Sequence, residues 1–192
     1  ILRNPIKRAF SHYSYACELG LETLNFEDAL DAEDNRLKNN WSSTFAYINQ
    51  GLFYSQVKAY KNAFTNVHVL FLDDLIKDKQ LEIQKIYNFL GIDSSFKNHF
   101  KEKFNVSGIP KNKFIHKYLV HDNAFKRKTK KLFKKIISET VLRKLARKAR
   151  NLNQGERLIA TDIEKQKLKN IYIKDIISLS NLLKKDLNHW LK

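Results

Sequence analysis

The sequence predicts an α/β domain: a parallel sheet with flanking helices, mostly helical in the portion present. Two apolar segments predict the strands. Ile1-Leu2 has the character of the last residues of a buried strand, and 67–72 is a β-branched apolar run without strict alternation. Continuous runs of this kind are typical of strands buried on both faces of a parallel sheet. No composition shift marks a domain boundary, so we expect a single domain over residues 1–192.

The composition is that of a folded domain, with 43% apolar and 29% charged residues. No apolar run approaches the ~18 residues that a membrane span needs, and the N-terminus lacks the pattern of a signal peptide. We therefore expect a cytoplasmic protein with no transmembrane segment. The single cysteine, Cys17, cannot form an internal disulfide and is expected to be a small buried residue.

The chain contains no methionine, and its first residue already lies in an expected strand. A strand at this position needs neighbours, and few other segments of the sequence can supply them. We expect the domain to be truncated at its N-terminus, with the upstream part of the sheet missing.

The first helix is predicted to run from Pro5 to about Leu19. Asn4 is a favoured N-cap residue, and Pro5 suits the first helical position, where its missing N–H costs nothing. Gly20 is a favoured residue just beyond the C-terminal end. The N-terminus of this helix is predicted to direct unpaired N–H groups and a positive dipole at whatever lies beyond the strand.

Two residues at this helix predict an anion site. Arg3 lies at the strand tip and Ser11 lies on the helix, eight positions later, so both could reach one phosphate. The alternative, given equal weight on this segment alone, is an ordinary helix cap beside a surface arginine.

Further helices are expected along the chain. The acidic stretch 21–40 predicts a short amphipathic helix over a loop, and an aromatic face predicts a helix over 47–64. The second strand is expected to end at Asp73-Asp74. A helix over 81–90, closed by Gly91, follows it.

The C-terminal part is predicted to be helical from Asn123 onward, apart from a connection over 151–160. The sequence from Thr161 to Glu164 fits a capping box, which predicts the start of the last helix. The final turn is expected to bury Trp190. A loop with Gly and Pro at 105–110 precedes Lys111, and a loop of this kind can approach a ligand.

The formal charge of +16 favours anionic partners, and it is concentrated in one tract. Residues 126–150 hold twelve Lys and Arg and one acidic residue, which is about +11 of the total. Apolar residues repeat every four positions through this tract, so we expect an amphipathic helix or helix pair. Its default interpretation is a solvated helix face; contact with an acidic glycan, a membrane surface or nucleic acid is the alternative.

The order of these motifs resembles the PAPS-dependent sulfotransferases. Four stretches carry the resemblance, in the family's order: 2–13 with Arg-Asn-Pro, 69–93 with Asp-Asp-Leu and Phe-Leu-Gly-Ile-Asp, 105–110, and 172–191 with Leu-Asn-His-Trp-Leu. The resemblance implies a P-loop-NTPase-like α/β fold. It also implies transfer of a sulfuryl group from 3′-phosphoadenosine 5′-phosphosulfate (PAPS) to a hydroxyl or amine acceptor, with carbohydrates among the candidates, and no metal.

The resemblance assigns residues to the donor nucleotide. Arg3 and Ser11 match the positions that hold the 3′-phosphate, and Lys111 lies where similar sequences carry a further basic residue. A guanidinium and a hydroxyl suit this role because charge-assisted hydrogen bonds to a phosphate contribute roughly 1.5–3 kcal/mol each. A solvated loop lysine is the alternative for Lys111.

The sequence departs from the family in one respect: the Gly-rich loop with its lysine, which would hold the 5′-phosphosulfate, is not in these residues. No catalytic residue can be assigned, because the histidines qualify by residue type alone (His12, His68, His116, His121). Two other hypotheses remain. The basic tract favours a helical nucleic-acid-binding module, although no groove-reading motif accompanies it, and an inactive relative could retain the fold as a scaffold.

Overall fold

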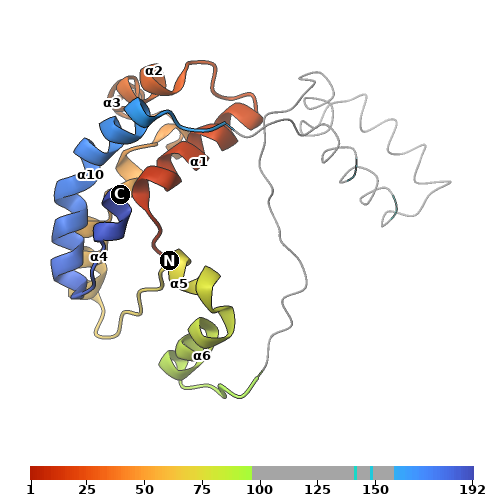
Figure 1. Cartoon of the computed structure of the whole chain (residues 1–192), viewed down its shortest axis with the longest axis vertical. Coiled ribbons are helices and arrows are strands. Elements are labelled where there is room, and N and C mark those ends of the chain that lie inside the picture. The colour runs from red at the N-terminus through yellow and green to blue at the C-terminus, as the bar shows by residue number, and fades with distance from the viewer. Residues whose placement is uncertain (97–140, 142–147, 149–157) are drawn as a thin grey trace.

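In a computed structural model, the chain is described for residues 1–96, 141, 148 and 158–192. The loop at 105–110, Lys111 and nearly all of the basic tract 126–150 lie outside the described residues. Within the described part, helices α1 (Pro5–Glu18), α4 (Phe53–Ala63) and α10 (Asp162–Leu183) pack together, and α5 (Leu72–Lys77) and α6 (Lys79–Leu90) form a pair beside them (Figure 1). None of the described helices has the length and apolarity to span a membrane.

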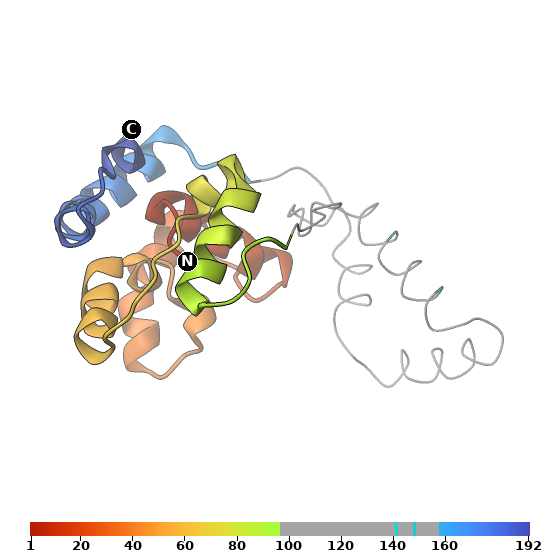
Figure 2. The same cartoon turned by 90° about the horizontal axis from the view of Figure 1, so that it is seen from below.

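The remaining described elements are short. Helices α2 (Phe26–Asp31) and α3 (Glu33–Lys38) replace the single helix expected over 21–40, and the 3₁₀ turns are η1 (Ser43–Phe45), η2 (Asn49–Gly51) and η3 (Asn188–Leu191). Figure 2 shows the polypeptide of 21–51 beside α4. This segment also contacts α10, where Lys167 pairs with Asp31 at 2.8 Å and the hydroxyl of Tyr172 donates to the carbonyl of Tyr47 at 3.1 Å.

The two expected strands meet, but only at one point. Leu2 and Phe71 form a parallel bridge, with Leu2 N–H donating to Leu70 O and Leu72 N–H donating to Leu2 O, both at 2.7 Å. The expectation of a complete strand over 67–72 is wrong, because among the described residues the pairing is limited to the single bridge of Leu2 with Phe71, and α5 begins at Leu72. Asp73 and Asp74 accordingly lie in the first turn of α5 instead of after a strand.

Local end signals place three helices where the sequence predicts them. Asn4 caps α1, and Pro5 is its first residue. Gly91 closes α6 with a φ of +67°. Thr161 and Glu164 form the capping box of α10, each accepting from the other's backbone N–H.

The helix expected over 47–64 begins later, at Phe53, because a distant carboxylate fixes its start. Asp175 of α10 accepts from the N–H groups of Phe53 (2.9 Å) and Tyr54 (3.2 Å). Glu33 likewise accepts from the N–H groups of Ile48 and Asn49, which holds the preceding segment out of the helix.

The core lies between α1, α4 and α10. Trp190 is 1% exposed, which confirms the expectation that the last turn buries it. Cys17 is only partly buried, at the edge of this core. The most deeply buried large side chains include those of Tyr47, Leu168, Tyr172, Ile176, Leu179 and Leu187.

Candidate anion-binding site at the start of helix α1

The candidate site lies where the first strand end passes into α1. The bridge between Leu2 and Phe71 fixes the direction of the chain, and Arg3 and Asn4 then lead from the bridge into the helix. Residues at this junction stand at the carboxyl ends of two parallel segments, which is where open α/β folds bind their ligands.

The side chain of Asn4 accepts the hydrogen bonds of the N–H groups at the start of the helix. Its Oδ1 accepts from Ile6 N–H at 2.9 Å and from Lys7 N–H at 3.1 Å, and its Nδ2 donates to the carbonyl of Trp190 at 3.1 Å. Pro5 has no N–H. The expectation of unpaired N–H groups in the first turn is therefore wrong: the helix dipole remains, but hydrogen bonds to an anion must come from side chains.

Arg3 lies along α1. Its Nη2 donates to the carbonyl of Lys7 at 2.9 Å. Burial lowers the pKa of Arg3, and the nearby cation of Arg8 lowers it further, while Asp73 acts in the opposite direction. A second cation close to a half-buried guanidinium makes this position favourable for an anion.

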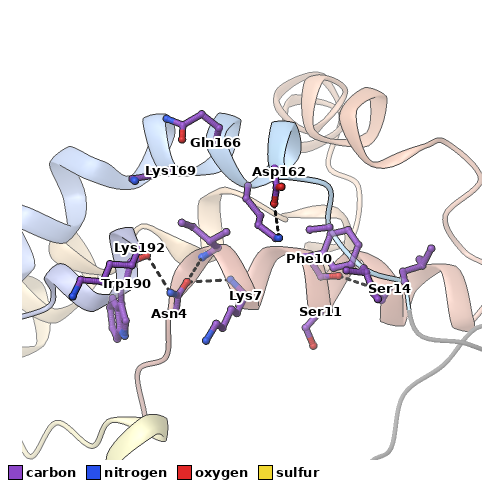
Figure 3. A pocket seen from close by; sticks show the side chains of 15 residues that line it. Asn4, Lys7, Phe10, Ser11, Ser14, Asp162, Gln166, Lys169, Trp190 and Lys192 are labelled. Atoms are coloured by element: carbon purple, nitrogen blue, oxygen red, sulfur yellow. Dashed lines mark hydrogen bonds and ion pairs between the residues drawn. The ribbon is translucent and has the colours of Figure 1, made fainter.

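The hydrogen bond to the Lys7 carbonyl places the Arg3 guanidinium near the helical turn of Ser11. In an α-helix the carbonyl of residue 7 faces the N–H of residue 11, so the Arg3 guanidinium reaches the turn that carries Ser11. Lys7 and Ser11 are four residues apart on α1, whereas Arg3 precedes the N-cap and reaches this part of the helix through its hydrogen bond to the Lys7 carbonyl. Figure 3 shows the side chains of Lys7 and Ser11 on the same side of α1, directed away from α10. The Arg3 guanidinium thus lies at the Lys7 carbonyl, one helical turn before Ser11; that the two residues share an anion stays a prediction.

A pocket of about 730 Å³ opens beside this part of the helix, between α1, the start of α10 and the C-terminal turn. Lys7 and Ser11 line it, whereas Arg3 does not. Its lining includes apolar residues (Ile6, Phe10, Leu158) and four lysines (Lys7, Lys165, Lys169, Lys192). Asp162 is its one acidic lining residue among those described, and it is paired with Lys165 at 2.8 Å.

Two of the four histidines considered from the sequence are described, and neither lines the pocket. His12 packs edge-on against Tyr47 with ring centroids 5.4 Å apart, and its Nδ1 is 3.3 Å from Arg8 Nη1. Burial lowers the pKa of His12, and Arg8 lowers it further, which favours a neutral ring. His68 packs against Phe89. Lys111, His116 and His121 lie outside the described residues.

The sequence analysis missed Lys7 and Trp190 as site residues. Lys7 could have been found, because it lies four residues before Ser11 in the predicted helix and therefore shares its helix face. Trp190 gives no such signal, since its contact with Asn4 joins residues 186 positions apart. Within the part of the chain that is described, no group of His, Cys, Asp and Glu side chains is arranged to hold a metal ion.

Comparison with solved structures finds a sulfotransferase from Alicyclobacillus acidocaldarius, with a TM-score of 0.66 and 20% identity. The match covers 100% of this chain and 56% of that one, so the chain spans little more than half of the bacterial enzyme's length. At this identity the likeness shows the fold. No curated protein matches the sequence. The family model "Sulfotransferase domain" matches residues 1–147 of the 192. The chain therefore belongs to the sulfotransferase domain family.

Proposed function

We propose that this chain is the nucleotide-binding part of an enzyme that transfers a sulfuryl group from PAPS to a hydroxyl or amine acceptor, carbohydrates among the candidates. Arg3 and Ser11 would bind the 3′-phosphate of the donor, and Lys111 would add charge to the same nucleotide. The observation that carries this proposal is the position of the Arg3 guanidinium, one helical turn from Ser11 at the carboxyl ends of two parallel segments. The single bridge is consistent with a P-loop-like parallel sheet built around it.

The pocket beside Ser11 supports the proposal. Its volume of about 730 Å³ lies within the range of about 300–1,000 Å³ typical of small-molecule sites. A lining of apolar side chains and lysines suits a ligand that has a flat apolar base and a phosphate. Lys7 would contribute a further positive charge on the phosphate side.

In the proposed reaction the bond between sulfur and the donor's bridging oxygen breaks, and sulfur bonds to the acceptor oxygen or nitrogen, which loses its proton. Such transfers depend on alignment and on stabilisation of charge more than on covalent work by the protein. The residues described would serve alignment: the 3′-phosphate contacts would fix the nucleotide, and the released 3′-phosphoadenosine 5′-phosphate (PAP) would keep the same contacts.

Calorimetry with PAP tests the proposal. Arg3→Ala should weaken PAP binding about tenfold to a hundredfold, because it removes charge-assisted hydrogen bonds of roughly 1.5–3 kcal/mol. Ser11→Ala should weaken it about threefold to tenfold. Adenosine 5′-monophosphate, which lacks the 3′-phosphate, should bind more weakly and should be insensitive to Arg3→Ala.

The matched control is Lys174→Ala, which removes one positive charge from an exposed position on α10. It should leave PAP affinity within twofold of the parent. The proposal is wrong if PAP does not bind, or if Arg3→Ala and Lys174→Ala have equal effects.

A further inference from the structure

A carboxylate lies close to Arg3 and could compete for it. The bridge between Leu2 and Phe71 sets Arg3 beside Leu72, and Asp73 follows in the first turn of α5. Asp73 is near enough to stabilise the charged form of Arg3, yet among the described residues no carboxylate forms an ion pair with this arginine. An arginine paired with its own protein's carboxylate is less available to a phosphate, so the lack of pairing needs a structural cause.

Asp73 is instead engaged by the C-terminal turn. The indole Nε1–H of Trp190 donates to Asp73 Oδ2 at 3.1 Å, and His189 Nε2 lies 3.6 Å from the same oxygen. The Trp190 ring is fixed by the core, with Phe71 at 5.9 Å and Phe53 at 6.5 Å between ring centroids. A donor held this rigidly orients the carboxylate that it binds.

Trp190 also holds the other side of the junction, because its carbonyl accepts from Asn4 Nδ2. One buried residue thus contacts the N-cap of α1 through its backbone and the first turn of α5 through its side chain. These two contacts lie on either side of Arg3, which precedes Asn4 in sequence and lies beside Leu72, the residue before Asp73.

We propose that Trp190 is a positioning residue that binds the Asp73 carboxylate and so keeps the Arg3 guanidinium available for the phosphate of the ligand. This inference rests on the proposed function, which identifies that phosphate as the 3′-phosphate of PAPS. Without the indole N–H, the Asp73 carboxylate turns to the Arg3 guanidinium and competes with the bound anion for it.

Trp190→Phe tests the competition, because phenylalanine retains an aromatic ring in the core and removes the donor. PAP affinity should fall about threefold to tenfold. Asp73→Asn in the same background should restore affinity to within twofold of the parent, because the amide carries no charge to attract Arg3. If Trp190 had a purely structural role, the second change would not restore PAP affinity. The proposal is therefore overturned if W190F weakens PAP binding and D73N does not restore it. It is also overturned if W190F leaves PAP affinity unchanged.

Asp73→Asn alone, with Trp190 present, provides a test that does not depend on the folding of W190F. It should bind PAP at least as tightly as the parent, because it removes a negative charge near the phosphate. Weaker binding would mean that Asp73 supports the site directly, and would overturn the proposal.

A measurement without nucleotide separates this inference from the proposed function. With Trp190 present, the shifts in urea midpoint caused by Arg3→Ala and Asp73→Asn should be only weakly coupled, because Asp73 acts on Arg3 without forming an ion pair. In the W190F background the coupling should be larger, because the two residues now pair. If PAP fails to bind the parent but this coupling appears, the proposed function fails and the positioning role of Trp190 stands; equal coupling in both backgrounds overturns the positioning role.

Discussion

Arg36 and Glu22 form a buried two-point ion pair, with Nη1–Oε2 at 2.5 Å and Nη2–Oε1 at 3.1 Å. Three more donors form hydrogen bonds to the Glu22 carboxylate: the hydroxyl of Tyr47 at 2.8 Å and the backbone N–H groups of Thr23 and Leu24. The rings of two aromatic residues lie about 5 Å from the guanidinium carbon (Trp41, Phe45). This cluster joins the turn after α1 to α3 and to the segment at residue 47, and so supports the helix that carries the candidate site.

Loss of the Glu22 charge should destabilise the fold strongly. Glu22→Gln leaves the Arg36 guanidinium buried without its counter-ion, a change that typically costs about 3–5 kcal/mol. Urea denaturation at neutral pH measures the free energy of unfolding. Glu27→Gln is the control, because Glu27 is 61% exposed and its pair with Lys167 at 3.4 Å should contribute under about 1 kcal/mol. Similar effects of the two variants would contradict the importance of the buried pair.

The same cluster should make stability depend on pH in the acid range. Burial alone would raise the pKa of Glu22, but the hydrogen bonds from Arg36, Leu24, Tyr47 and Thr23 outweigh it and lower the pKa from 4.5 to about 2. The unfolded chain therefore binds the proton more readily than the folded chain. The stabilisation is complete above pH 4.5 and is lost as the pH falls from 4.5 toward 2.

The difference between the parent and Glu22→Gln isolates this effect from other titrating groups. Urea denaturation of both proteins should show a constant gap in unfolding free energy from pH 7 to about pH 5 and a narrowing gap below it. A gap that does not change down to pH 3 would contradict the lowered pKa of Glu22.

The elements that sequence predicts correctly are those with local end signals. Asn4 and Pro5 place the start of α1, and the capping box at Thr161 places the start of α10, because each signal acts within four residues. The strand over 67–72 failed for the opposite reason. Its apolar run fits a strand, but among the described residues only Leu2 pairs with it, and a strand forms only as far as its partners extend.

In the candidate site, too, the features that depend on local spacing could be predicted, and those that depend on distant residues could not. Lys7 and Ser11 share a face of α1 because they are four residues apart, and Arg3 directly precedes the N-cap of the same helix. The neighbours that set its electrostatics, Asp73 and Trp190, are brought there by the fold, and no pattern in the sequence links them to Arg3. Likewise, the use of the first-turn N–H groups by Asn4 depends on its side-chain rotamer, which its contact with Trp190 helps to fix.

The cap of α4 from α10 should be measurable on its own. Asp175→Ala removes the acceptor for the N–H groups of Phe53 and Tyr54, and loss of such a cap costs about 1–2 kcal/mol. Asp175→Asn retains one side-chain oxygen and should cost less. Hydrogen exchange of the two amides should accelerate in the alanine variant. Unchanged exchange at both positions would show that another group caps α4.

Gly51 is required because Tyr172 lies against it. A Cβ at residue 51 would lie 2.6 Å from the Tyr172 hydroxyl oxygen, and that hydroxyl donates to the carbonyls of Tyr47 (3.1 Å) and Ile48 (3.0 Å). Gly51→Ala should therefore destabilise the fold by about 1–3 kcal/mol, the usual cost of overpacking. Tyr172→Phe removes the atom that makes the closest contact, so the double variant should lose less stability than the sum of the two single variants.

Gly91→Ala serves as the comparison for this pair. Apart from its chain neighbours, no atom of the described residues lies within 4 Å of a Cβ at residue 91, but the φ of +67° should make alanine cost about 1 kcal/mol. Because the strain at Gly91 is in the backbone, Tyr172→Phe should not reduce it. Urea denaturation of the single and double variants decides between the two causes. If Tyr172→Phe reduces the loss of stability at Gly51 but not at Gly91, the cost at Gly51 is a steric contact with the tyrosine. Strictly additive losses of stability at both glycines would show that Tyr172 does not cause the cost at Gly51.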